Sequence, residues 1–266
     1  MPEVTIDPAW LAEHLDAPEI AIADCCFALM QPELGRQQYE AGHIPGAYYF
    51  DLNQDLSSPV QKHGGRHPLP DPDRLSAKLS RMGITSSTLV IAYDDSQFGF
   101  AARFWWLLRY LGHDRVFVLN GGFTNWKNLG YPVTTIEPPA KSGNFTPQVR
   151  TDWIVDIEAV KAKKDLPNVA LIDSREAERY RGEREPIDPI AGHIPGAVNY
   201  PWQAVTDDRG FLESQDWSDL ESKEEILVYC GSGVTACVNL LSLADAGIDR
   251  AKLYPGSWSD WCSYQV

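Results

Sequence analysis

One cysteine of this chain stands in a setting that could make it a nucleophile. The apolar run Ile226–Tyr229 leads directly into Cys230. A turn of mostly small residues follows, ahead of a stretch with helical periodicity: Gly231, Ser232, Gly233, Val234, Thr235 and Ala236. The N–H groups of such a turn, with a helix N-terminus behind them, can form a nest that binds an anion. A nest favours the thiolate and predicts a nucleophilic Cys230; the alternative is a buried, inert cysteine.

Other chemistries that use cysteine do not fit this turn. A thiolate phosphatase needs an arginine after the loop to grip phosphate, but the residues here are Thr235, Ala236 and Cys237. A peroxidase-like thiol needs a resolving partner, and Cys237 falls on the predicted helix beyond the loop. The sequence has no CxxC pair and no HExxH motif, so no metal site is predicted.

The elements that position Cys230 are predicted from an internal repeat. The hexapeptide GHIPGA occurs at Gly42–Ala47 and again at Gly192–Ala197. Three more pairs of segments occur in the same order in both halves: Ala21–Asp24 with Ala170–Asp173, Leu89–Tyr93 with the run ending at Tyr229, and Leu111–Trp126 with Ala246–Trp261. Matching segments in a fixed order indicate a duplicated unit.

Each half alternates short apolar strands with helical stretches, which predicts an α/β fold with a mostly parallel central sheet flanked by helices on both faces. We expect a non-catalytic domain at residues 1–136, a proline-containing linker at 137–147 and a catalytic domain at 148–266. The first half is assigned as non-catalytic because Asp94 stands where the second half has Cys230. The first half also carries a long irregular loop within Asp51–Pro72, and such loops are often functional.

Composition and charge limit the partners. The chain has 266 residues, 44% of them hydrophobic, and a formal net charge of −14. Nucleic acid and anionic membrane surfaces both require concentrated Lys and Arg, so neither is expected as a partner. No apolar run is long enough to span a bilayer, and no secretory signal is visible. Five cysteines, two of them adjacent, suit no small disulfide framework, so we expect a cytoplasmic protein.

These motifs together resemble the tandem-domain sulfurtransferases of the rhodanese superfamily. The resemblance covers both halves and rests on the duplicated GHIPGA, the DSR at Asp173–Arg175, the C-terminal GSWSDW and the loop CGSGVTA. It implies that Cys230 takes sulfur from a small donor as a persulfide and passes it to a thiophilic acceptor such as cyanide, a thiol or a carrier protein. It further implies that residues 231–236 stabilise the persulfide and that no cofactor or metal takes part.

The resemblance also implies residues that bind the donor. Arg179 aligns with an arginine that holds the donor's anionic end. A second family arginine follows a proline, but Pro186 is followed here by Ile187, which leaves Arg184 or Arg181 as candidates. Ser232 and His67 align with two members of a proposed Ser–His–Asp relay, and the aspartate position is Asn53, with Asp51 nearby.

The CGSGVTA loop is the form associated with 3-mercaptopyruvate as the donor, so the sequence predicts an enzyme that uses this compound. The missing second arginine makes thiosulfate the alternative donor. An alternative of a different class is a non-catalytic module that only carries a persulfide on Cys230. The sequence does not predict the oligomeric state.

Overall fold

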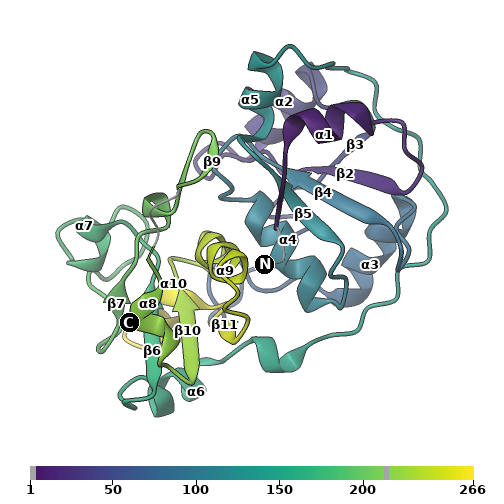
Figure 1. Ribbon diagram of the computed structural model, residues 1–266. Helices are drawn as coiled ribbons and strands as arrows, with labels where there is room; N and C mark the ends of the chain where they lie inside the picture. Colours follow the sequence, from purple (N-terminus) through teal and green to yellow (C-terminus); the bar gives the residue numbers. More distant parts are fainter. Residues whose placement is uncertain (1–3, 213–215) are drawn as a thin grey trace.

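The computed structural model describes residues 4–212 and 216–266 as two α/β domains that lie side by side (Figure 1). The strands of the first domain are β1 (Thr5–Ile6), β2 (Ile20–Asp24), β3 (Ala47–Tyr49), β4 (Leu89–Tyr93) and β5 (Val116–Leu119). The main strands of the second domain are β6 (Val169–Asp173), β7 (Val198–Asn199), β10 (Glu225–Tyr229) and β11 (Ala251–Leu253). A separate antiparallel hairpin pairs β8 (Thr206–Asp207) with β9 (Gly210–Phe211).

Four strands of each main sheet share one topology, and the first sheet has β1 as an additional edge strand. Their strand orders are β1-β5-β4-β2-β3 and β11-β10-β6-β7, and every pairing in them is parallel. The register also repeats, because Asp24 pairs with Tyr93 in the first sheet and Asp173 pairs with Tyr229 in the second. The sequence repeat is therefore a repeat of four strands in the same order, and the predicted fold class is confirmed.

Helices cover both faces of each sheet. In the first domain they are α1 (Pro8–Glu13), α2 (Glu33–Ala41), α3 (Pro72–Arg81), α4 (Ala101–Tyr110) and α5 (Gly122–Asn128). In the second they are α6 (Ile157–Lys163), α7 (Ala177–Tyr180), α8 (Ser218–Glu221), α9 (Ala236–Asp245) and α10 (Ser257–Ser263), with short 3-10 turns at Thr151–Trp153 and Trp202–Ala204. Among the residues described, none of these helices is long and apolar enough to cross a membrane.

The two domains share a core. Helices α4 and α9 pack against each other at the interface, and one cluster of buried apolar side chains runs through both. Smaller clusters lie on the outer faces, under α1 and α5 in the first domain and under α6 and α10 in the second. A shared core of this kind fixes the orientation of the domains, so that a site can be assembled from both.

Local sequence explains where several helices begin. Asp7, Asp71 and Asp156 each lie just before a helix, and each carboxylate accepts a hydrogen bond from a backbone N–H of the first turn, at 2.7 to 2.9 Å. Proline follows Asp7 and Asp71 at the first helical position, where no N–H is needed. An aspartate before a helix, and above all one followed by proline, is a local sequence signal that predicts such a cap.

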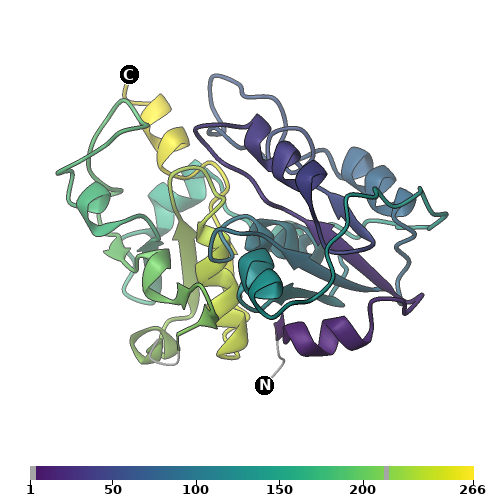
Figure 2. The ribbon, with the colours of Figure 1, turned by 90° about the horizontal axis from the view of Figure 1, so that it is seen from above.

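Each domain extends one segment onto the other. The loop between β3 and α3, residues 50–71, reaches α10 of the second domain, where the Gly64 N–H donates to Asp260 and the His63 ring stacks on Tyr264. Seen from above, this loop lies next to the C-terminal helix (Figure 2). The β8–β9 hairpin follows β7 as the loop follows β3, and it reaches back to the first domain beside Asn120 (Figure 1).

Candidate active site

Cys230 lies at the carboxyl end of β10, where the chain turns toward α9, and its side chain is 1% exposed. The turn needs glycine at position 233, which has a φ of +75°. A Cβ there would lie 2.4 Å from the carbonyl oxygen of Pro255, closer than any side chain allows. The sharp turn at Gly233 lets residues 231–235 curl around the end of the strand.

The C-terminal segment holds this turn by its carbonyl groups. Trp258 and Ser259 donate their N–H groups to the carbonyl oxygens of Cys230 and Gly231, at 3.0 and 2.9 Å. Ser257, whose φ is +56°, accepts the Cys230 N–H on its Oγ at 3.1 Å. In the described part of the chain, the N–H groups of residues 231–235 donate to no protein acceptor. These N–H groups are therefore available to an anion, as the predicted nest requires.

The first domain supplies the other wall of the site. In its 50–71 loop, the Arg66 N–H donates to the Ser259 Oγ at 3.2 Å, next to the cysteine turn. The imidazole Nδ1 of His67 lies 2.7 Å from the Ser232 Oγ. A side chain of one domain thus reaches a residue two positions after Cys230 in the other domain.

Two guanidinium groups flank the turn. A Cβ added to Gly231 would lie 3.1 Å from Arg66 Nη2 and 3.5 Å from Arg179 Nη1, so both cations approach the residue next to Cys230. Asp188 forms ion pairs with both of them, and Glu185 pairs with Arg179 at 2.7 Å. Two cations fixed by carboxylates in this way can bind the anionic end of a small molecule.

A cavity of about 410 Å³ opens beside these groups. It is lined by residues of both domains: Phe27, Leu29, Met30, Asn53, Val60, Arg66, His67, Ile187 and Ser232. Asp51 is occupied elsewhere, because one of its carboxylate oxygens accepts the N–H groups of Asn53 and Gln54, both at 2.8 Å. The described residues therefore place Ser232 against His67 without a carboxylate behind the imidazole.

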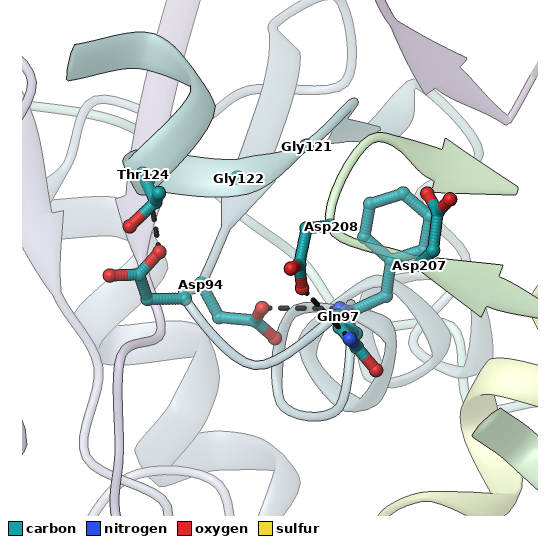
Figure 3. A pocket seen from close by; sticks show the side chains of 9 residues that line it. Asp94, Gln97, Gly121, Gly122, Thr124, Asp207 and Asp208 are labelled. Carbon is teal, nitrogen blue, oxygen red and sulfur yellow. Dashed lines mark hydrogen bonds between the residues drawn. The ribbon is translucent and has the colours of Figure 1, made fainter. Parts of the chain in front are cut away.

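The duplicate of this turn in the first domain already contains an anion acceptor. The Asp94 carboxylate accepts the N–H groups of Ser96, Phe98, Phe100 and Ala101, at 2.7 to 3.2 Å. Burial raises the pKa of Asp94, and these four hydrogen bonds oppose the rise. Asp94 lines a pocket of about 190 Å³. Figure 3 shows it in this pocket together with Asp207 and Asp208 of the β8–β9 hairpin. The fold thus builds the same nest twice, and only the second copy has a thiol at its centre.

The family follows from a comparison with known domains. A model described as "Rhodanese-like domain" matches residues 7–129 and 156–264, which is most of the chain and both of its sheets. The chain belongs to the rhodanese family. Its two rhodanese domains correspond to the two halves of the internal repeat.

Relatives of this rhodanese carry two kinds of name. A Pseudomonas aeruginosa protein named "Probable 3-mercaptopyruvate sulfurtransferase" is 44% identical over 94% of this chain and 92% of its own length. A Mycobacterium tuberculosis protein named "Putative thiosulfate sulfurtransferase" is 38% identical over 98% and 94%. The crystal structure of Escherichia coli SseA, described among 3-mercaptopyruvate sulfotransferases, matches with a TM-score of 0.82 at 31% identity, covering 97% of this chain and 99% of that one.

The structure brings together most of the site residues predicted for this rhodanese. Cys230, Ser232, His67 and Arg179 meet around the turn at residues 231–236. Arg184 requires a correction, because its side chain is 69% exposed, lies beside Glu178 and does not line the cavity. Arg181 likewise lies on the surface, paired with Glu183. Both belong to the charged, exposed segment that follows α7, whereas the Arg179 side chain is only 12% exposed.

Arg66 was not predicted as a site residue. It comes from the other domain, so its distance from Cys230 in the sequence gives no indication of contact. The available signal was its place beside His67 in the long loop of the first domain. Because Arg66 stands next to Cys230 while Ile187 lines the same cavity, the second cation of this site comes from the first domain.

His67 is held as a neutral imidazole. Burial, together with the charges of Arg103 and Arg66, lowers the pKa of His67 to about 3. A neutral ring keeps one N–H donor and one acceptor at all pH values at which the protein is expected to work. His67 is therefore suited to hydrogen bonding with Ser232 and a bound carbonyl rather than to carrying positive charge.

The depressed pKa of His67 predicts acid sensitivity. An unfolded chain protonates this histidine near pH 6.5, whereas the folded protein does so near pH 3, so stability falls as the pH drops below about 6.5. At pH 5 the loss from this group is about 2 kcal/mol. The free energy of unfolding can be measured in urea at pH 7.5 and at pH 5.0. The loss between the two pH values should be about 2 kcal/mol smaller in His67→Gln than in wild type. His14→Gln, at the end of α1, is the control; an equal loss in His67→Gln and wild type would contradict the prediction.

Proposed function

We propose that this rhodanese is an enzyme that transfers sulfur from 3-mercaptopyruvate to a thiophilic acceptor through a persulfide on Cys230. The observation that carries the proposal is the turn after Cys230, whose N–H groups at residues 231–235 have no acceptor among the described residues, with the guanidinium groups of Arg66 and Arg179 beside Gly231. The nest suits an anionic sulfur and the two cations suit a carboxylate. The relatives named as 3-mercaptopyruvate sulfurtransferases support the same donor.

In the first step the Cys230 thiolate attacks the sulfur of mercaptopyruvate. The new S–S bond forms as the C–S bond breaks, and the electron pair of that bond leaves with the carbon as the enolate of pyruvate. Ser232 and His67 lie where they can hydrogen-bond the ketone oxygen of the donor, on which the enolate charge develops. The enolate then takes up a proton to give pyruvate, and Cys230 is left with an outer sulfur.

In the second step the acceptor attacks the outer sulfur of the persulfide. The S–S bond breaks, its electron pair returns to the Cys230 sulfur as thiolate, and the acceptor leaves with the transferred sulfur. The N–H groups of residues 231–235 can stabilise the negative charge in both states, because the thiolate and the persulfide lie at the centre of the same turn. No resident cofactor is required by this sequence of steps.

Thiosulfate is the second candidate donor. It is also anionic and could bind to the same two guanidinium groups, and one relative is named for it. The test compares kcat/KM for pyruvate release from mercaptopyruvate with kcat/KM for thiocyanate formation from thiosulfate and cyanide. We expect the value for mercaptopyruvate to be at least about tenfold higher, a difference of roughly 1.4 kcal/mol in transition-state binding. A higher value for thiosulfate would reverse the assignment.

Turnover also separates an enzyme from a carrier module. An enzyme releases many equivalents of pyruvate in the presence of an acceptor, whereas a carrier would yield at most one sulfur per chain. All five cysteines are free thiols, which supports a reducing compartment, and we propose the cytoplasm as the location. The partners of this function are a small sulfur donor and a thiophilic acceptor.

A further inference from the structure

Arg103 is a charged residue at the centre of the domain interface. It projects from α4 of the first domain and is 0% exposed. Its Nη1 donates to the carbonyl oxygen of Gly233 in the cysteine turn at 3.0 Å. Its Nη2 donates to the carbonyl oxygens of His67 and Leu56, at 3.2 and 3.5 Å, both in the 50–71 loop. One guanidinium group therefore joins the two segments that form the active site.

No carboxylate compensates this charge. Among residues 4–212 and 216–266, Arg103 takes part in no ion pair, and its Nε has no hydrogen-bond partner. A buried ion without a counter-charge is costly, and three carbonyl dipoles replace only part of its hydration. The position that duplicates Arg103 is the apolar Val238, because α4 and α9 both have ten residues and begin at the duplicated residues Ala101 and Ala236. The duplicated fold therefore does not itself require a cation at this place.

The groups close to Arg103 that can carry negative charge are two thiols. Burial lowers the pKa of Arg103, and the sulfurs of Cys237 and Cys230 act in the opposite direction. Burial also raises the pKa of Cys237 to about 12, so Cys237 is neutral near pH 7. The remaining candidate is the sulfur of Cys230, as thiolate or as persulfide. An anion there would restore electroneutrality beneath the turn.

We propose that Arg103 is the buried counter-cation of the anionic sulfur on Cys230 and the positioning residue that holds the Gly233 turn and the His67 segment together. As the counter-cation of the thiolate, Arg103 acts whatever the donor is. As the counter-cation of the persulfide, its role rests on the proposed function. It assigns to the first domain a direct electrostatic part in the reaction. Arg103 acts through the field at the sulfur and through two carbonyl groups, without contacting the donor.

The test measures the Cys230 thiol directly, so that it does not depend on the identity of the donor. The rate of alkylation by iodoacetamide is followed against pH, with the Cys230 peptide quantified by mass spectrometry in wild type, Arg103→Met and Arg103→Lys. Arg109→Met is the matched control, because Arg109 lies on the same helix, is partly exposed and pairs with Asp114 and Asp249. The other groups facing Cys230 are unchanged in all variants: the cations of Arg66 and Arg179 and the neutral His67 and Cys237.

We expect the midpoint of the alkylation profile to rise by about one pH unit in Arg103→Met, the size of one charge interaction in a partly screened site. Arg103→Lys, which keeps the charge, should stay close to wild type, as should Arg109→Met. With mercaptopyruvate, Arg103→Met should also slow persulfide formation about tenfold at pH 7.5, with little change in KM.

A midpoint in folded Arg103→Met that equals wild type would overturn the proposal. If the methionine variant does not fold, Arg103→Gln replaces it, because its amide can still donate to Gly233 while carrying no charge; an unshifted midpoint in that variant is equally decisive. The two proposals can fail separately. If wild type forms no persulfide but the alkylation midpoint still rises in Arg103→Met, the proposed function is refuted, while the role of Arg103 as counter-cation stands.

Discussion

Cys230→Ser is expected to lower kcat/KM for both donors by at least about a thousandfold, because a serine hydroxyl is neither ionised near neutral pH nor able to form a persulfide. The exchange leaves the rest of the turn in place. The backbone of residue 230 is fixed by Ser257 and Trp258, and neither contact involves the sulfur. Circular dichroism and the midpoint of thermal unfolding should therefore match wild type.

Mass spectrometry gives the same prediction a second readout. After incubation with mercaptopyruvate in the absence of acceptor, the wild-type peptide that contains Cys230 should gain the mass of one sulfur atom, and the variant peptide should not. Cys262→Ser serves as the control, since Cys262 is a second buried thiol, in α10, whose sulfur donates to the Ile190 carbonyl. Retained turnover in Cys230→Ser would mean that the nucleophile lies elsewhere.

Arg66→Met is expected to reduce kcat/KM for mercaptopyruvate by about 10- to 100-fold, the value of a lost charge-assisted hydrogen bond of roughly 1.5 to 3 kcal/mol. Most of the loss should appear in KM if Arg66 binds the carboxylate equally in the ground and transition states. The variant leaves Asp188 paired with Arg179 alone, so one cation is then neutralised by two nearby carboxylates, Asp188 and Glu185.

The double variant Arg66→Met/Ile187→Arg sharpens this test. Ile187 lines the same cavity as Arg66, so an arginine placed there returns a cation to the site from the second domain. We expect the double variant to regain a measurable part of the lost kcat/KM. Arg184→Met is the control, because Arg184 is exposed, and its kcat/KM should stay within about twofold of wild type. If Arg184→Met lost as much kcat/KM as Arg66→Met, then Arg184 would also bind the donor, and the assignment of Arg66 as the second cation would be contradicted.

Most of the fold could be predicted from the internal repeat of the sequence. Strands such as Leu89–Tyr93 and helix caps such as Asp71 were predictable because their signals are local: apolar runs, Asp before Pro, and glycine after the last helical turn. The comparison of Asp94 with Cys230 also placed the active turn in the second half. Helix α2 and the β8–β9 hairpin were not predicted, because α2 is mostly polar and each strand of the hairpin has only two residues.

The candidate site was predictable only where its residues follow Cys230 along the chain or align with a family motif. Arg184 was proposed because it is near Arg179 in the sequence, but it lies in the irregular segment that follows α7, and its side chain faces solvent. Arg66 and Arg103 belong to the other domain. Their contacts with Gly231 and Gly233 depend on how two sheets pack, which no pattern in a single sequence encodes.

The exchange of segments between the domains has a consequence for how this protein can vary and be divided. The 50–71 loop of the first half lies over the Cys230 turn, and the β8–β9 hairpin of the second half lies over the Asp94 turn. The two halves therefore resemble two subunits of a dimer that are joined in one chain. If the chain were cut between them, the half that carries Cys230 would lose Arg66, His67 and Arg103 together, and with them one donor cation, the hydrogen bond to Ser232 and the buried charge under Gly233. A substitution at these three positions should therefore be selected against as strongly as one beside Cys230. The half without a nucleophile thus supplies groups that the site in the other half needs.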